Sequence, residues 1–340
     1  MDEIKQKLLE ADPFSTWWPY LASGLVFIIT IIKNFMSGDM CPNTNTIDGQ
    51  VVVITGGNGG IGKMVCQELC NRKGHVVIAS KDPDKMDKVK HALLKNNPRA
   101  TVEVRYLDLR SFDCVRRFVK QLADDFQHID VLINNAGITF YPCGKTVDGF
   151  ETHLQVNYLA HMYLTCLMLR DKLLQRDSRI VNVSCHAYLS AKMTIDDPLN
   201  LGKWAPAFHA RDAFAHSKAA IVMASRQLSD VLKQKGITVN ACTPGLVRGT
   251  GHLANSPLMG ALCAKVITFP WMWLFMKSAD KGAQVIVHLA SDPKFKTDTG
   301  GFYNDCQLVE ISDLAKDKDL QRKLFNETLK VLKLDQDIFN

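Results

Sequence analysis

The chain has 340 residues, a length that suits one large α/β domain with a short appendage. Lysine and arginine (41) exceed aspartate and glutamate (35) by only six, without a basic block, so the charge pattern indicates no nucleic-acid partner. The ten cysteines show neither CxxC nor Cys/His spacing, which argues against a disulfide framework and predicts no metal site.

The N-terminal region has the pattern of a membrane anchor. Residues 1–12 are typical of a short polar helix, and residues 14–32 carry no charge over a length close to the roughly 20 residues that span hydrocarbon. Trp17 and Trp18 stand near one end and Lys33 closes the other, as expected of interfacial anchors. No small-residue cleavage site follows, so residues 1–37 are predicted to hold an uncleaved single-pass anchor, with a monotopic or signal segment as the alternative.

Residues 38–49 are rich in Asn, Thr and Pro and are expected to form a linker. Strand-like and helix-like segments alternate in residues 50–340, which predicts a single α/β domain with a doubly wound parallel sheet. The expected strands are Val51–Thr55, His75–Ala79, Thr101–Asp108, Val131–Asn134, Arg179–Ser184 and Thr238–Thr243. The expected helices include Ile61–Lys73, Phe112–Phe126, Gly149–Leu174, Phe214–Lys235 and Lys281–Ala290.

The first strand runs directly into a glycine-rich turn, Val51 to Gly62, with the sequence VVVITGGNGGIG. Glycines suit a chain that must reverse within a few residues and lie close to a pyrophosphate. The following helix N-terminus offers free N–H groups and a positive dipole to the phosphates. The stretch therefore predicts a nucleotide cradle, although a purely structural turn is the alternative for this stretch alone.

Further motifs follow in a fixed order: Asp108-Leu109, Asn134-Asn135-Ala136-Gly137, Asn157, Ser184-Cys185, Ser217-Lys218 and Pro244-Gly245. Together, from Val51 to Tyr303, they resemble the short-chain dehydrogenase/reductase family. The strings RIVNVS, HSKAA and GGFYNDC, with the N-terminal anchor, are most similar to its membrane-bound, retinol-dehydrogenase-like branch. The resemblance implies a Rossmann fold held on an intracellular membrane, such as that of the endoplasmic reticulum.

The resemblance also implies which positions hold a nicotinamide dinucleotide. Asp108 would touch the adenine, Asn135 would lie beside the adenosine ribose, and the backbone of Val247 would meet the carboxamide. The family's threonine after Pro-Gly is replaced by Gly249, with Thr250 one residue later. The full set of matching positions is Gly56, Asn58, Gly60, Ile61, Gly62, Asp108, Asn135, Ala136, Gly137, Lys218, Pro244, Gly245 and Val247.

The second strand ends without an acid that could accept a hydrogen bond from a ribose 2′-OH. Lys81 stands where NADP-using members of the family often have a cation, so NADP(H) is favoured over NAD(H). The adjacent Asp82 acts against this preference, and a merely solvated Lys81 is the alternative.

At the catalytic positions the chain departs from the family. Lys218 and Asn157 match, the latter being the helix asparagine that holds a proton-relay water. Phe214 replaces the tyrosine that exchanges a proton with the substrate oxygen, and Cys185 replaces the serine that hydrogen-bonds to it. Phenylalanine has no proton to give and a thiol is a weak donor. Tyr188, shortly after Cys185, is the first candidate for a substitute donor, but the favoured interpretation of this residue is a loop tyrosine that is exposed or packed under the cap.

Residues 251–277 correspond to the family's variable substrate cap, and the apolar run 266–276 either covers a lipophilic ligand or enters the bilayer. Two functions are therefore expected. One is an oxidoreductase on a retinoid-, steroid- or polyprenoid-like alcohol, aldehyde or ketone, with weak or atypical catalysis. The other is a catalytically silent scaffold, cofactor sensor or membrane-complex subunit. The resemblance also implies a homodimer through the helices that carry Asn157 and Lys218.

Overall fold

The computed structural model describes residues 17–38, 40–201, 208–249 and 271–339. The expected N-terminal polar helix and most of the expected cap over 251–277 lie outside these residues. In the described part, one sheet has the strand order β3-β2-β1-β4-β5-β6-β7-β8. Its strands are β1 Val51–Thr55, β2 His75–Ser80, β3 Thr101–Tyr106, β4 Val131–Asn134, β5 Arg179–Val183, β6 Thr238–Thr243, β7 Phe302–Asn304 and β8 Gln307–Leu308.

The sheet is parallel except at its last strand, where β8 pairs antiparallel with β7. At the centre of the sheet, Val52 of β1 pairs with Val76 of β2 on one side and with Val131 of β4 on the other. All three valines are fully buried, as expected for β-branched residues of a sheet covered on both faces. The strand order reverses between β1 and β4. In open α/β sheets, ligands bind at such a reversal, in a crevice outside the carboxyl ends of the strands.

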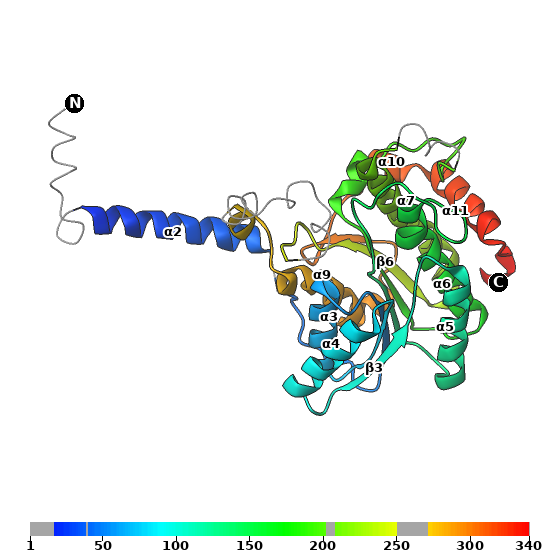
Figure 1. Ribbon diagram of the computed structural model, residues 1–340, viewed down its shortest axis with the longest axis horizontal. Helices are drawn as coiled ribbons and strands as arrows, with labels where there is room; N and C mark the ends of the chain where they lie inside the picture. The colour runs from blue at the N-terminus through cyan, green and yellow to red at the C-terminus, as the bar shows by residue number, and fades with distance from the viewer. Residues whose placement is uncertain (1–16, 39, 202–207, 250–270, 340) are drawn as a thin grey trace.

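Helices cover both faces of the sheet (Figure 1). One face is covered by α3 (Gly60–Asn71), α4 (Pro83–Asn96) and α9 (Ala279–Ser291), and the other by α5 (Phe112–Asp125), α6 (Ala160–Arg170) and α7 (Ala210–Leu232). A π-helical segment, Leu154–Leu159, leads into α6, so the helix predicted over Gly149–Leu174 is shorter and irregular. Short 3-10 turns lie at His186–Ser190, Lys233–Lys235, Pro293–Lys296 and Gln336–Phe339.

The helix α2 (Trp18–Ser37) projects from the domain, and none of its residues is buried (Figure 1). It is long and apolar enough to cross a membrane, and at 1.5 Å per residue its 20 residues measure about 30 Å, the thickness of the hydrocarbon core. The candidate anchor predicted from the sequence is thus a continuous helix over its described residues.

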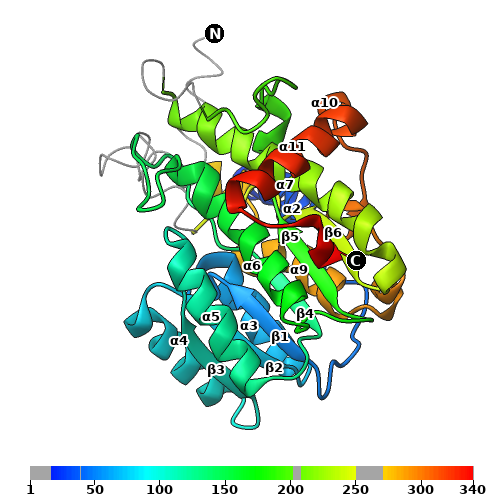
Figure 2. The same ribbon diagram turned by 90° about the vertical axis from the view of Figure 1, so that its right-hand side faces the viewer.

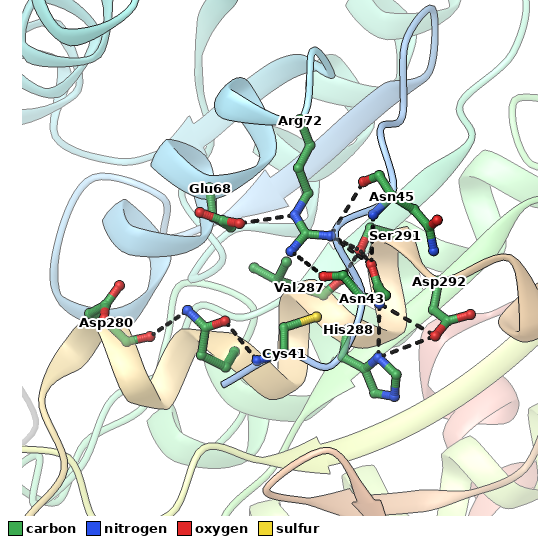
Figure 3. Close-up of polar contacts among 11 residues, drawn as sticks. Cys41, Asn43, Asn45, Glu68, Arg72, Asp280, Val287, His288, Ser291 and Asp292 are labelled. Carbon is green, nitrogen blue, oxygen red and sulfur yellow. Dashed lines mark hydrogen bonds and ion pairs between the residues drawn. The ribbon is translucent and has the colours of Figure 1, made fainter. Parts of the chain in front are cut away.

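Residues 40–48, expected as a linker, are bound to the domain. The buried guanidinium of Arg72 donates hydrogen bonds to Oδ1 and the backbone oxygen of Asn43 at 2.6 and 2.8 Å, and to Oγ of Ser291 at 3.0 Å (Figure 3). Ile47 is 1% exposed. The segment is therefore fixed between the end of α3 and the end of α9 and does not act as a free tether.

The C-terminal helices α10 (Asp313–Lys316) and α11 (Lys318–Leu332) were not among the predicted elements. Figure 2 shows α11 lying across α7. Leu324 and Phe325 of α11 are buried in the same core as Leu228 of α7, and every residue of α6 from Ala160 to Leu169 is buried. The face through which the resemblance implied a homodimer is thus covered by the chain's own C-terminus, and we do not retain that expectation.

Candidate active site

A cavity of about 770 Å³ opens at the carboxyl ends of the central strands, within the size range of small-molecule sites. It brings together all but two of the catalytic and cofactor-binding residues predicted from the sequence. Those that line it are Gly56, Asn58, Gly60, Ile61, Gly62, Lys81, Asp108, Asn135, Ala136, Gly137, Cys185, Phe214, Lys218, Pro244, Gly245 and Val247. Asn157 and Tyr188 do not line it.

The turn after β1 is shaped by glycines at positions where a side chain would not fit. Gly56 has a φ of +68°, and a Cβ there would lie 2.9 Å from Cα of Ala136. A Cβ on Gly62 would lie 2.3 Å from the Gly56 carbonyl oxygen. Helix α3 begins at Gly60 without a side-chain cap, so its first N–H groups remain available to a ligand in the cavity. This turn fits the pyrophosphate of a dinucleotide.

The loop after β4 is held against this turn by Thr55. Its Oγ1 accepts hydrogen bonds from the backbone N–H groups of Asn135 and Ala136 at 3.0 and 2.9 Å. The side-chain amide of Asn135 donates to the Thr55 carbonyl at 2.9 Å. The two loops that would flank an adenosine ribose are therefore one hydrogen-bonded unit.

A buried histidine that the sequence analysis did not single out extends this unit. Nδ1 of His161 lies 3.0 Å from the Asn157 carbonyl, and Nε2 lies 2.9 Å from Oγ1 of Thr55. A carbonyl can only accept, so the network assigns the hydrogen to Nδ1, and Nε2 accepts from the Thr55 hydroxyl. Burial lowers the pKa of His161 to about 4, and the charge of Lys218 adds to this effect.

At the end of the cavity where the family resemblance places the adenosine, carboxylates and cations alternate. Arg110 forms a bidentate pair with Asp108, with contacts of 3.0 and 2.6 Å. Burial acts to raise the pKa of Asp108, but Arg110 and the nearby Lys81 outweigh it and hold the pKa below its ordinary value. Asp82 caps α4 by accepting from the Lys85 backbone N–H at 3.1 Å, and it pairs with the Lys85 ammonium at 2.8 Å. Arg110 and Lys85 also line the cavity and were missed from the sequence, because neither belongs to a family motif.

Asn157 lies in the π-helical segment and connects two parts of the site. Its Oδ1 accepts from the Ile138 N–H at 2.8 Å, and its amide donates to the Ile138 carbonyl at 3.1 Å and to Ser217 Oγ at 2.9 Å. It therefore ties the loop after β4 to α7. Irregular π-helical turns are frequent at functional sites.

Phe214 and Lys218 lie one turn apart on α7, on the side that faces the cavity. Nζ of Lys218 donates to the Val183 carbonyl at 3.1 Å and lies 5.8 Å from the centre of the Phe214 ring. Burial lowers the pKa of Lys218, against the opposing effect of the Cys185 and Cys242 thiols. Burial also disfavours the charged form of Cys185, and it therefore raises the pKa of this thiol. The thiol stays protonated at neutral pH and is a weak hydrogen-bond donor.

Tyr188, the first candidate for a substitute donor, is directed away from the cavity. The 3-10 turn His186–Ser190 buries its ring, which contacts Phe302 with the ring centres 5.3 Å apart. Its hydroxyl oxygen accepts from the Ser312 N–H at 3.2 Å. In this position it packs against β7, and it has no route to a substrate oxygen in the cavity.

His186 lies on the cavity wall instead. Among the described residues that line the cavity it is the one histidine, and its side chain is exposed there. Nδ1 of His186 lies 3.4 Å from Oγ1 of Thr243, which orients the ring beside the Pro244-Gly245 turn. His216, two residues after Phe214, is buried and does not line the cavity, and His209 precedes α7 as its N-cap.

The chain matches known proteins over most of its length. Residues 50–194 match the family model described as short chain dehydrogenase. Human retinol dehydrogenase 13 is 31% identical over 305 residues, which cover 90% of this chain and 91% of that protein. Human retinol dehydrogenase 11 is 33% identical over 328 residues, covering 94% and 98%.

Solved structures agree in fold. A crystal structure of an uncharacterized protein from Mycobacterium paratuberculosis has a TM-score of 0.68 at 29% identity, and the match covers 88% of this chain and 98% of that chain. L-sorbose reductase from Gluconobacter frateurii, solved with NADPH and L-sorbose, has a TM-score of 0.59 at 19% identity, covering 76% and 95%. These two structures agree with the fold. The sequence matches to the family model and to the two retinol dehydrogenases show that the chain belongs to the short-chain dehydrogenase/reductase family and is related there to the retinol dehydrogenases.

Proposed function

We propose that the chain binds NADP(H) in this cavity and acts as a slow oxidoreductase on a lipophilic alcohol, aldehyde or ketone of retinoid, steroid or polyprenoid type. The observation that carries the proposal is that one cavity combines an intact pyrophosphate cradle with Lys218, while Phe214 stands where the family's proton donor is expected. The names of the retinol dehydrogenase relatives support a lipophilic substrate.

The preference for NADP(H) rests on the charges at the adenosine end. The carboxylate of Asp82 is engaged by Lys85 as the cap of α4, and therefore it is poorly placed to accept from a ribose 2′-OH. Lys81 and Arg110 present positive charge at the same end of the cavity. A 2′-phosphate would be stabilised by these cations.

The nicotinamide supplies or accepts a hydride when it is bound. Lys218, positively charged and fixed by the Val183 carbonyl, would hold the neighbouring ribose. Because Phe214 cannot exchange a proton, another group must do so at the substrate oxygen. We assign this role to His186, whose Nε2 is left for a substrate while Nδ1 is held near Thr243. Cys185 offers the oxygen a weak thiol donor.

A second function is favoured by a specific observation, the loss of both the phenol at position 214 and the hydroxyl at position 185. A protein that kept its cofactor cradle without these groups would serve as a scaffold, a cofactor sensor or a subunit of a membrane complex. In either case we place the protein on an intracellular membrane, such as the endoplasmic reticulum, through α2, the one described helix that is long and apolar enough to cross it.

The two functions are separated by an experiment on the full chain in lipid nanodiscs. Binding of NADPH and NADH is measured by cofactor fluorescence, and oxidation of NADPH is followed with a panel of retinoid, steroid and polyprenoid carbonyls. Slow turnover that Lys218→Met abolishes supports the oxidoreductase. Tight NADPH binding without turnover on any carbonyl supports the scaffold or sensor, and failure to bind either dinucleotide contradicts both.

A further inference from the structure

An exposed apolar surface lies beside the cavity. Residues 271–275 are helical, and the side chains of Trp271, Trp273 and Phe275 are 64%, 42% and 38% exposed. The rings of Trp271 and Phe275 stack with their centres 5.8 Å apart. Leu246, 63% exposed, lies close to this segment, because its carbonyl accepts a hydrogen bond from the backbone N–H of Lys277 at 2.8 Å. We call these four exposed side chains the apolar rim.

The apolar rim borders the cavity. Met276 follows directly in the chain but is buried, and it lines the cavity together with Leu246 and Val247. The same short segment therefore turns Met276 inward and its two tryptophans outward. Exposed aromatic residues grouped at the mouth of an apolar site mark a surface that a partner covers.

The apolar rim is also attached to the candidate membrane anchor. Nζ of Lys33, near the end of α2, donates to the Trp273 carbonyl and, at 3.5 Å, to the Met276 carbonyl. The same ammonium lies 5.0 Å from the centre of the Trp273 ring. Arg248 donates to both carbonyls as well, at 2.8 and 3.3 Å. Two cations thus stabilise the carbonyl end of the helical turn, and one of them belongs to α2.

A second contact fixes the end of α2. A Cβ on Gly38 would lie 2.6 Å from Oδ1 of Asp305 and 2.8 Å from Nζ of Lys277, two groups that form an ion pair. The Lys277 side chain packs against Gly245 on its other side, where a Cβ would lie 2.9 Å from Nζ. The end of α2 is therefore in contact with Lys277, which also packs against the Pro244-Gly245 turn of the cavity wall. The following residues are held by Arg72, as Figure 3 shows.

These contacts fix how the domain faces a bilayer. Helix α2 has no buried residue, so its apolar side chains need hydrocarbon around them, and Lys33 marks the level at which the helix leaves it. The apolar rim lies at that same level because Lys33 touches it. Figure 1 shows α2 and the segment carrying the rim on one side of the domain, with α11 on the opposite side. Tryptophan is the side chain most enriched at this interface.

We propose that the apolar rim is a membrane-docking surface. It inserts into the lipid interface beside α2, and the opening of the cavity then lies against the bilayer. The partner is the bilayer itself, because the rim is continuous with the one described helix that requires hydrocarbon. The docking does not depend on the proposed activity. A lipophilic ligand would enter the cavity from the membrane without crossing water.

The unmodified chain tests this directly in nanodiscs made with phosphatidylcholine that carries a photoactivatable group on its acyl chain. After illumination, labelled peptides are mapped by mass spectrometry. We expect label in α2, which is the internal positive control, and also in residues 271–276, with none in α11. Label confined to α2 would overturn the proposal.

Tryptophan fluorescence gives an independent measurement. The chain has five tryptophans, so the triple variant Trp17→Phe, Trp18→Phe, Trp204→Phe emits only from Trp271 and Trp273. In nanodiscs with brominated acyl chains its emission is expected to fall, and iodide in the water is expected to quench it weakly. The matched control replaces all five tryptophans by Phe and introduces Arg322→Trp on the exposed side of α11. The control tryptophan is expected to be quenched by iodide and not by bromine. If the emission of Trp271 and Trp273 shows the same response, the rim lies in water and the proposal is wrong.

Discussion

The ammonium of Lys218 faces a phenylalanine ring, with Nζ 5.8 Å from the ring centre of Phe214. In this arrangement the cation that would lower the pKa of a phenol is present and the phenol is missing. The lysine donates to the Val183 carbonyl and is buried. Under the proposed function, the phenylalanine would separate dinucleotide binding from proton transfer within one helix turn.

Phe214→Tyr adds one hydroxyl on a ring that already lines the cavity. We expect it to raise the rate of NADPH-dependent carbonyl reduction by about 10²- to 10⁴-fold, the usual contribution of a positioned general acid. The rate is measured as NADPH oxidation at saturating substrate. Phe214→Leu is the matched control, because it changes the ring without adding a proton donor. An equal gain in Phe214→Leu would show that space, and not the hydroxyl, limits the reaction.

His186→Gln tests the residual activity of the chain with Phe214 in place. If His186 gives the proton, the variant should lose about 10²-fold or more of the turnover, while its NADPH affinity stays unchanged. Tyr188→Phe is the control, because the Tyr188 hydroxyl contacts the Ser312 N–H and does not reach the cavity. Turnover that survives in His186→Gln but disappears in Tyr188→Phe would contradict the assignment.

Lys81→Glu places a negative charge at the adenosine end of the cavity. NADPH binding should weaken by about 10- to 100-fold, the range of one hydrogen bond to a charged group, whereas NADH binding should change little. Dissociation constants of both cofactors are measured by fluorescence titration. Lys95→Glu makes the same charge change in the last turn of α4, away from the cavity, and should leave both constants unaltered. Equal losses for NADPH and NADH in Lys81→Glu would mean that Lys81 does not recognise a 2′-phosphate.

The sequence predicted the central strands and sixteen of the residues that line the cavity, because both depend on local patterns. Valine-rich strands and the glycine turn are read from neighbouring residues, and parallel topology then brings the strand ends together. The position of Tyr188 depends instead on a distant contact: a 3-10 turn directs its ring toward Phe302, 114 residues later in the chain. The docked linker depends on Arg72, whose partner Ser291 is 219 residues away, and no local pattern encodes such a contact.

The C-terminal helix α11 gives a prediction on assembly. Because Leu324 is fully buried against the α7 side of the core, Leu324→Ala should lower the free energy of unfolding by about 2–5 kcal/mol. Wild-type protein in detergent should not associate through α6 and α7, and crosslinks between copies should avoid these helices. Arg322→Ala, at an exposed position of α11, is the control for the stability measurement. Crosslinks that join α7 of two copies would show that α11 can be displaced by a partner.

The buried His161 predicts a loss of stability in mild acid. Its pKa is about 4 in the folded chain, because burial and the charge of Lys218 disfavour the imidazolium, whereas an unfolded histidine has a pKa of about 6.5. Between these values the unfolded chain binds a proton that the folded chain does not. The stabilisation that depends on a neutral His161 is therefore fully present above about pH 6.5. It is lost as the pH falls toward 4, and this lowers the free energy of unfolding by about 3 kcal/mol at most.

The thermal unfolding midpoint, measured in detergent from pH 7.5 to 4.5, should fall over this window. His161→Gln removes the titrating group and should flatten the fall, even though its midpoint at pH 7.5 is lower because the contacts to Thr55 and the Asn157 carbonyl are disturbed. His91→Gln, on the exposed side of α4, should keep the wild-type slope. His216, whose pKa burial also lowers to about 4, leaves a remaining slope in His161→Gln. An unchanged pH dependence in His161→Gln would mean that its imidazole is not kept neutral by the fold.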